Sequence, residues 1–558
     1  MHDLLFRQAQ VFDGTGSEPA TLDVAVTAGR ISAIGPNLGS DAREVIPADG
    51  LALMPGIIDS HTHFDAQITW DPAVRPSPAL GVTTAVIGNC GFTIAPCRPQ
   101  DRDITMRNLT QVEGMSLDVL RHGIAWEFET FPEYLAQLRG TGSTVNIAAY
   151  IGHSSVRTYV MGADASQRAA TNTEIAQMQQ IVRDAMRAGA VGFASSTSPA
   201  HNGEGGRPMP SRLADEREMQ ALVTAMGEGG RGVYMLTKGA ETPMPFLESL
   251  AANSGRPVMV AALLHNSTNP QAVFDDLDAI SDANTRGHRL IGQVSCCPLT
   301  MDFTMQSPYP AEGLASWQPA LGRQGDALKA KLGSKEFRDG VRAELATPSK
   351  FRLFNGEWAK VQVVETATAA NTHYEQRSID EIARSEGRDP LDVMLDLALA
   401  ENLQTVFTAQ LLNSDEAAVD RMLNHPHSLV SLSDAGAHLT FFNDAGFGLH
   451  LLGHWSRDRD AMPMSEAVRR LTSQPAGIFG MRDRGLIREG LAADLLLFDP
   501  RTVGRGPKRR VFDLPGGAPR LTTDAVGVHG VWVNGQRVAD AKGLLEPAPR
   551  AGVLLADA

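Results

Sequence analysis

The sequence predicts an α/β protein, a (β/α)8 TIM-like barrel with a small β-sandwich domain built from both chain termini. Through the middle of the chain, apolar runs of strand length alternate with stretches of helical periodicity. Both ends instead carry short alternating runs broken by Gly and Asp, which are typical of antiparallel strands. A doubly wound open sheet is the alternative that the same alternation allows.

Each expected element follows from a local pattern. In the N-terminal part, the runs 4–6, 22–26 and 30–35 predict a meander of strands. Near the C-terminus, residues 493–499 and 528–535 show the same pattern of strand, turn and strand. Apolar runs predict eight barrel strands at 56–59, 83–87, 145–150, 190–194, 232–236, 258–264, 290–294 and 428–432. Residues 173–187 carry apolar side chains at helical spacing and predict one of the intervening helices.

The order of these elements suggests where the domains of the protein begin and end. The two parts of the sandwich are expected at 1–55 and 481–558, and the barrel at 56–480. The seventh and eighth strands are separated by far more residues than an ordinary connection needs. We therefore expect a long insertion at about 300–425.

Composition narrows the possible partners. The 558 residues include 64 Asp and Glu against 50 Lys and Arg, a net charge of −14, and 508–510 is a short basic run in an otherwise acidic chain. A nucleic-acid partner is therefore not expected. Four cysteines are too few for a disulfide framework, and no apolar stretch reaches ~18 residues. The expectation is a cytoplasmic protein without a membrane partner.

Candidate metal ligands stand after three predicted strands. His61 and His63 follow the first strand, and on an extended backbone they project to the same side and can converge on one metal ion. Cys90 follows the second strand, where a thiolate could bind metal or a buried cysteine could be inert. Asp434 follows the eighth strand. Its carboxylate could bind metal and take a proton from water, or could cap a helix or form a turn.

Five motifs follow one another along the chain: Pro55–His63, Asn89–Gly91, Gly152–His153, Ser433–Asp434 and Gly490–Leu495. Together they resemble the amidohydrolase superfamily and, within it, the N-acyl-D-amino-acid deacylases. The resemblance covers nearly the whole chain and implies a site with one or two Zn²⁺ ions. It assigns His61, His63, Cys90 and Asp434 as metal ligands, with Asp434 also catalytic.

Two ligands of that family are not matched cleanly, because it has a histidine at the ends of both strands five and six. The fifth strand is followed here by Lys238, which could contact the substrate as an ammonium group, act as a carboxylated metal ligand or stay solvated. The sixth is followed by His265, a metal ligand only if the strand ends or bulges before it. The lysine and arginine that hold the substrate carboxylate in these deacylases have no evident counterpart.

Three further residues have possible roles near the site. His153, after the third strand, could donate to a substrate carbonyl and so be catalytic, and Arg157 could bind an anionic group of the substrate. Loop scaffolding is the alternative for both. His201 lies in a Gly-rich loop after the fourth strand and could shape the mouth of the pocket and bind substrate.

The sequence thus predicts a metal-dependent hydrolase that cleaves a C–N amide bond with metal-activated water. Phe441 and Phe442 beside Asp434 favour a bulky or apolar amide as the small-molecule substrate. A carbamate, lactone or cyclic amide is the alternative substrate. A non-catalytic scaffold is a further alternative, since the strand-five histidine is missing. The superfamily resemblance also implies a homo-oligomer.

Overall fold

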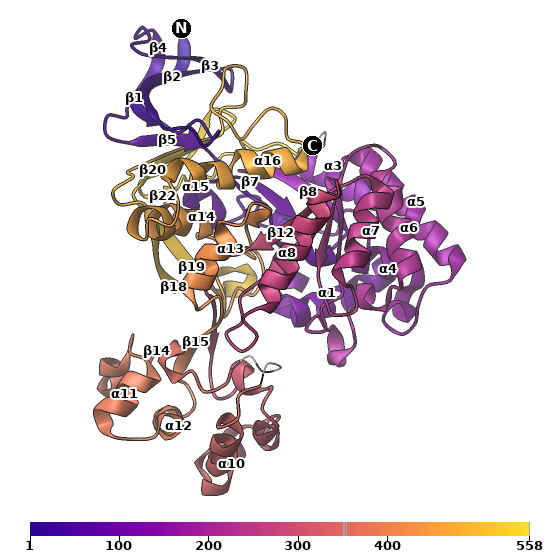
Figure 1. Ribbon diagram of the computed structural model, residues 1–558, viewed down its shortest axis with the longest axis vertical. Coiled ribbons are helices and arrows are strands. Elements are labelled where there is room, and N and C mark those ends of the chain that lie inside the picture. Colours follow the sequence, from indigo (N-terminus) through magenta and orange to yellow (C-terminus); the bar gives the residue numbers. More distant parts are fainter. Residues whose placement is uncertain (350–351, 353, 557–558) are drawn as a thin grey trace. The chain divides into compact units, whose positions relative to one another are not determined.

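The computed structural model describes residues 1–349, 352 and 354–556 (Figure 1). The chain forms two compact units. Unit 1 comprises Met1–Leu263, Asp276–Cys296 and Met422–Ala558, and unit 2 comprises Leu264–Asp275 and Cys297–Arg421. Unit 2 overlaps the region where the sequence predicts a long insertion.

Eight parallel strands form the central sheet of unit 1, in the order β16-β12-β11-β10-β9-β8-β7-β6. They are β6 (Ile57–Asp59), β7 (Val82–Ile87), β8 (Asn146–Gly152), β9 (Gly192–Ser196), β10 (Val233–Thr237), β11 (Val258–Leu263), β12 (Leu290–Val294) and β16 (Ser428–Val430). Beyond the ends of the outermost strands, Thr62 and Ala435 form a parallel bridge. The sheet is therefore curled like a TIM barrel, and its strands run in sequential order without the reversal of a doubly wound sheet.

Helices alternate with these strands along the chain, as the sequence pattern predicts. They are α1 (Arg102–Val112), α2 (Leu117–Gly123), α3 (Phe131–Thr141), α4 (His153–Met161), α5 (Asn172–Ala188), α6 (Glu216–Gly227), α7 (Met244–Ser254), α8 (Ala272–Thr285), α13 (Glu416–Leu423), α14 (Phe447–His450), α15 (Met464–Leu471) and α16 (Ser473–Phe479). Helix α5 begins with a capping box between Thr171 and Glu174 and ends at Gly189 in the left-handed conformation. Its buried stripe includes Ile175 and Val182, which confirms the expected helix.

Strands from both termini share one nine-stranded sheet. It contains β1 (His2–Val11), β2 (Ala20–Thr27), β3 (Arg30–Gly35), β4 (Ala42–Pro47), β5 (Ala52–Pro55), β17 (Leu495–Phe498), β20 (Val528–Val533), β21 (Gln536–Asp540) and β22 (Gly543–Leu544). The two ends of the chain join where β5 pairs with β17, and Phe6 packs edge-on against Trp532 with their ring centroids 4.8 Å apart. A hairpin of β18 (Gly504–Leu514) and β19 (Ala518–Val526) stands apart from this sheet. Where the sequence predicts a separate sandwich domain, the structure has a sheet shared by both termini, and this sheet belongs to unit 1.

Unit 2 has its own core. Strands β13 (Leu299–Phe303), β15 (Val406–Leu412) and β14 (Val361–Glu365) form an antiparallel sheet. Helices α9 (Gly325–Gly333), α10 (Lys335–Leu345), α11 (Ile379–Glu386) and α12 (Pro390–Ala400) accompany it. Trp317 and Phe407 are among its buried side chains. Among the described residues, none of the helices combines the length and apolar character needed to cross a membrane.

Candidate metal centre

Three buried side chains converge at the ends of β6 and β7. One donor atom from each of His61, His63 and Cys90 lies within 4.8 Å of the others. The Sγ atom of Cys90 is 3.5 Å from Nε2 of His61. Cys90 belongs to a short turn, η3 (Asn89–Gly91), directly after β7, and its φ is +57°. A residue other than Gly in this region is strained, which is common at functional sites.

Asp434 reaches the same point from the end of the eighth strand. Its Oδ1 lies 3.3 Å from Nε2 of His61 and 3.6 Å from Nε2 of His63. Asp434 also has a positive φ, +47°. Two residues later, a Cβ on Gly436 would meet the backbone carbonyl of His63 at 2.7 Å, so only glycine allows this close approach. The loop after β16 is therefore shaped to bring the carboxylate to the histidines.

Residues behind the cluster orient it. Nδ1 of His61 is 3.0 Å from Oε1 of Gln293, and Nδ1 of His63 is 3.2 Å from Oε1 of Glu113. These contacts direct both Nε2 atoms toward Cys90 and Asp434, as second-shell partners of metal-binding histidines do.

Thr237, the last residue of β10, donates from Oγ1 to Sγ of Cys90 at 3.1 Å. It thus occupies the strand-five end, where the sequence analysis considers Lys238. Sequence reasoning missed Thr237, Gln293 and Glu113. A glutamine inside the apolar run 290–294 was a usable signal, whereas nothing local distinguishes Glu113.

The cluster favours the charged forms of its acidic groups. Burial raises the pKa of the Asp434 carboxyl, but the hydrogen bond with His63 and the charge of His61 outweigh it and hold this pKa well below its usual range. Burial likewise raises the pKa of the Cys90 thiol, while His61 and His63 lower it, with a net decrease. Carboxylate and thiolate are the metal-binding forms of these side chains.

The donor set fits a metal ion. The nitrogen and sulfur donors of His61, His63 and Cys90 lie within 4.8 Å of one another, and Oδ1 of Asp434 lies 3.3 and 3.6 Å from the two Nε2 atoms. Histidine, cysteine and carboxylate side chains are ligands that Zn²⁺ accepts in tetrahedral geometry. His61 and His63 keep their outer nitrogens on a glutamine and a carboxylate, so the inner nitrogens are left for the ion.

Comparison with known proteins places this arrangement in a family. The profile of the Amidohydrolase family matches residues 44–539. The chain belongs to the amidohydrolase family. This agrees with the resemblance carried by the sequence motifs, and it confirms the predicted reaction class, a metal-dependent hydrolase of carbon–nitrogen bonds.

Relatives of this amidohydrolase match over almost its whole length. D-aminoacylase of Alcaligenes xylosoxydans xylosoxydans is 28% identical over 542 residues, covering 96% of this chain and 94% of the relative. N-acyl-D-aspartate deacylase of the same organism is 28% identical over 562 residues, covering 99% and 95%. The solved N-acyl-D-glutamate deacylase from Bordetella bronchiseptica, complexed with zinc and a phosphonate inhibitor, has a TM-score of 0.67 at 25% identity and covers 99% of both chains.

Two neutral imidazoles lie near the metal centre of this amidohydrolase. Nδ1 of His201 is 2.6 Å from Oγ of Ser196, and its ring packs on Phe92 at 4.9 Å. Burial, with the charges of His438 and His63, lowers the pKa of His201 to about 3. Burial also lowers the pKa of His438 to about 4. Both rings are thus uncharged near neutral pH and offer hydrogen bonds rather than charge.

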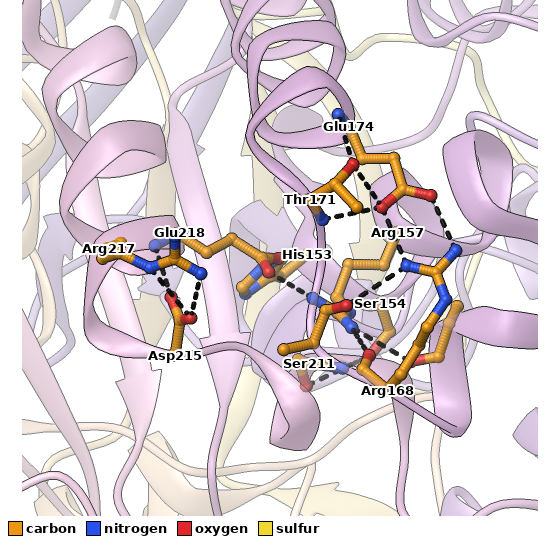
Figure 2. Close-up of polar contacts among 12 residues, drawn as sticks. His153, Ser154, Arg157, Arg168, Thr171, Glu174, Ser211, Asp215, Arg217 and Glu218 are labelled. Carbon is orange, nitrogen blue, oxygen red and sulfur yellow. Dashed lines mark hydrogen bonds and ion pairs between the residues drawn. The ribbon is translucent and has the colours of Figure 1, made fainter.

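His153 and Arg157 meet at Glu218, as Figure 2 shows. Nδ1 of His153 is 2.8 Å from Oγ of Ser195 and Nε2 is 2.8 Å from Oε1 of Glu218. The guanidinium of Arg157 contacts the other Glu218 oxygen and the carbonyls of Ala165 and Arg168. Both ring nitrogens of His153 are therefore engaged, and the contacts favour scaffolding over the predicted roles in catalysis and anion binding.

Lys238 and His265 have partners of their own. Nζ of Lys238 lies 3.1 Å from the carboxylate of Asp276 on α8, which favours an ammonium group among the three alternatives. His265 belongs to unit 2, where its backbone N–H donates to Asn413 and its ring packs near Phe274. Its role as a metal ligand stays a prediction.

Proposed function

We propose that this protein is a zinc-dependent deacylase that hydrolyses the amide bond of N-acyl-D-amino acids. The observation that carries the proposal is the buried cluster of His61, His63 and Cys90, with the Asp434 carboxylate within 3.6 Å of both histidine Nε2 atoms. The substrate class is supported by the relatives named D-aminoacylase and N-acyl-D-aspartate deacylase, whose similarity extends over nearly the whole chain.

His61, His63, Cys90 and Asp434 would hold the zinc ion. A bound zinc ion supplies Lewis acidity toward water and toward the amide carbonyl. Of the chain's own groups, Asp434 is placed to move the proton. Its side chain remains 25% exposed although it contacts both histidines, so water and substrate can reach it.

The proton follows a simple path in this proposal. The Asp434 carboxylate accepts a proton from the attacking water and returns it to the amide nitrogen as the C–N bond breaks. One water and one amide thus give one carboxylic acid and one amine. The low pKa of Asp434 keeps it in the accepting form before the reaction. His438 and His201, both uncharged, border the reacting groups.

The test is Asp434→Asn, assayed on zinc-loaded protein with a panel of N-acetyl-D-amino acids. We expect kcat to fall by about 10²–10⁴-fold, the usual contribution of a general acid–base group, while the circular dichroism spectrum is unchanged. Asp49→Asn, at an exposed position, is the matched control and should keep wild-type kcat. Zinc per chain is measured for each protein, so that loss of metal is separated from loss of proton transfer.

Three outcomes would count against the proposal. A zinc-retaining Asp434→Asn protein with near-wild-type kcat would remove Asp434 from proton transfer. Wild-type protein that holds zinc but hydrolyses no panel member would reject the substrate class and favour a carbamate, lactone or cyclic amide. Wild-type protein that takes up no zinc would favour the non-catalytic scaffold.

A further inference from the structure

A pocket of about 340 Å³ lies at the end of the barrel opposite the metal centre. Its lining includes Val233, the first residue of β10, and Arg256 and Arg289, which stand just before β11 and β12. The metal ligands instead follow the carboxyl ends of β6, β7 and β16. Because all these strands are parallel, the two places are at opposite ends of the sheet. The volume falls within the ~300–1,000 Å³ range of small-molecule sites.

Four arginines line this arginine pocket: Arg231, Arg256, Arg289 and Arg482. None of its lining residues within the described part of the chain is Asp or Glu. Strand register brings the first three arginines together, since Tyr234 pairs with Val258 and Val258 pairs with Leu290 on neighbouring strands. Positive charge is therefore concentrated at one place in a chain whose net charge is −14.

Two of these arginines hold the wall of the pocket. Arg256 donates from Nε to the carbonyl of Gly232 at 3.1 Å and from Nη1 to the carbonyl of Gly230. Arg231 donates to the carbonyls of Met186 and Ala556. These contacts fix the two guanidinium groups through neutral backbone oxygens.

The other two arginines have free side chains. Within residues 1–349, 352 and 354–556, Arg289 and Arg482 donate no side-chain hydrogen bond, and no carboxylate lies within 4.0 Å of them. Of the acidic residues nearby in the sequence, Glu228 pairs with Arg183 at 2.8 Å and Asp483 pairs with Arg484 at 3.1 Å. Both of these carboxylates therefore already have arginine partners.

The positive charges in the arginine pocket act on one another. Burial lowers the pKa of Arg256, and the like charge of Arg289 lowers it further. The carboxyl end of α16 also borders the pocket, at Gly477–Gly480. A helix end supplies only about half an elementary charge, which is too little to balance four guanidinium groups. The charge balance therefore favours a bound anion.

We propose that the arginine pocket binds a small molecule that carries two or more linked phosphates, such as pyrophosphate or a nucleoside diphosphate. Guanidinium groups make paired hydrogen bonds to phosphate oxygens and stay charged at neutral pH. A single carboxylate would bring one negative charge, whereas two linked phosphates bring about three. This ligand would be neither substrate nor product of the metal centre, and its binding does not depend on the proposed hydrolysis.

The experiment is calorimetric titration of zinc-loaded protein with pyrophosphate, adenosine diphosphate, adenosine and citrate. Pyrophosphate and adenosine diphosphate should bind, and adenosine and citrate should bind at least about 10-fold more weakly. Arg289→Gln and Arg482→Gln should each weaken pyrophosphate binding by about 10–100-fold, as expected for loss of hydrogen bonds to a charged group. Arg488→Gln, exposed and without a side-chain partner among the described residues, is the control and should bind as wild type. Zinc per chain is measured after each titration.

Melting temperature separates a ligand site from a structural role. Because the side chains of Arg289 and Arg482 contact no partner among the described residues, both variants should melt no lower than wild type in the absence of anions. Pyrophosphate should raise the melting temperature of wild type and of Arg488→Gln, but not of the two pocket variants. Lower melting of both variants together with wild-type pyrophosphate affinity would show that the arginines only stabilise the fold.

Three other results would overturn the inference. Unchanged pyrophosphate binding in both pocket variants would place the anion elsewhere, at the metal centre. Wild type that binds neither phosphate compound would leave the pocket without its ligand. Citrate binding as tight as that of pyrophosphate would reject the phosphate class. Equal affinities for pyrophosphate and adenosine diphosphate would support a site for the phosphates alone, and tighter binding of the nucleotide would support one that also contacts the nucleoside.

Discussion

Two buried clusters in unit 1 contain the same kinds of side chain but are organised in opposite ways. In the network of His153, Glu218 and Arg157, both ring nitrogens and both carboxylate oxygens have protein partners (Figure 2). In the metal centre, the Nε2 atoms of His61 and His63 face a carboxylate oxygen and a sulfur at 3.3–3.6 Å. In the first cluster the histidine and the carboxylate have all their polar atoms paired, whereas the second gathers electron-pair donors that a cation would bring together.

The difference shows how a scaffold and a site can be distinguished. A buried ion pair is tolerated when the two charges and their hydrogen bonds compensate each other, as Arg157 and Glu218 do. Several electron-pair donors that face one another are stable in a folded protein when a bound ion or substrate interacts with all of them. From the sequence, His153 and His61 looked similar, since each follows a barrel strand. Only their partners separate them.

The largest effect on stability is expected from Glu218→Gln, which breaks the self-satisfied cluster. The substitution leaves the Arg157 charge buried without its carboxylate, and the free energy of unfolding should fall by about 3–5 kcal/mol. Zinc affinity should change little, because none of the metal ligands contacts Glu218. Denaturant unfolding and zinc titration measure the two quantities. Glu216→Gln, on the exposed face of the same helix, is the control. Loss of zinc binding without loss of stability would mean that the two clusters are one functional unit.

A smaller effect is expected from Gln293→Leu, which acts behind the metal centre. Without the acceptor for Nδ1, His61 loses its orientation, and zinc affinity should fall by about 10–100-fold. Gln293→Glu keeps an acceptor at the same place and should retain most of the affinity. A competing chromophoric chelator gives the dissociation constants. Equal affinity in wild type and the leucine variant would show that the orientation of His61 is set elsewhere.

The smallest effect on stability is expected at a third carboxylate, Glu401 in unit 2. Like Glu218 it accepts several hydrogen bonds, but these come from neutral groups. It accepts from the backbone N–H groups of Ala367 and Thr368 and from the side chains of Asn371 and Thr405. Burial raises its pKa, but these hydrogen bonds prevail and lower the pKa to about 2.

Because this pKa lies below the ordinary glutamate value, the Glu401 contribution to stability is complete above about pH 4.5 and is lost as the pH falls toward 2. Glu401→Gln should therefore melt at a lower temperature than wild type at pH 7, and the gap should narrow at pH 4 and below. Scanning calorimetry at both pH values measures it, with the exposed Glu365→Gln as control. A gap independent of pH would show that charge is not the cause.

Much of this molecule could be predicted from local patterns. All eight barrel strands lie at or within a few residues of the apolar runs that predicted them, because a buried parallel strand must be continuously apolar. His61 and His63 were identifiable because an alternating spacing on an extended backbone puts both on one face. Thr237, by contrast, escaped notice beside the more conspicuous Lys238, since a one-residue difference on a strand decides which side chain faces inward.

The sequence by itself determined the periodicities, and hence the order of strands and helices, the pairing of the two termini and the residue types available at the strand ends. The tertiary structure decided which of those residues meet. Glu113, Gln293 and Asp434 come from distant parts of the chain, yet each is within 3.6 Å of one of the two histidines. Closing the barrel brings such segments together. A histidine at a strand end can then pair fully with a carboxylate, or it can face other metal-binding side chains. Which of the two occurs depends on tertiary contacts that no local sequence pattern encodes.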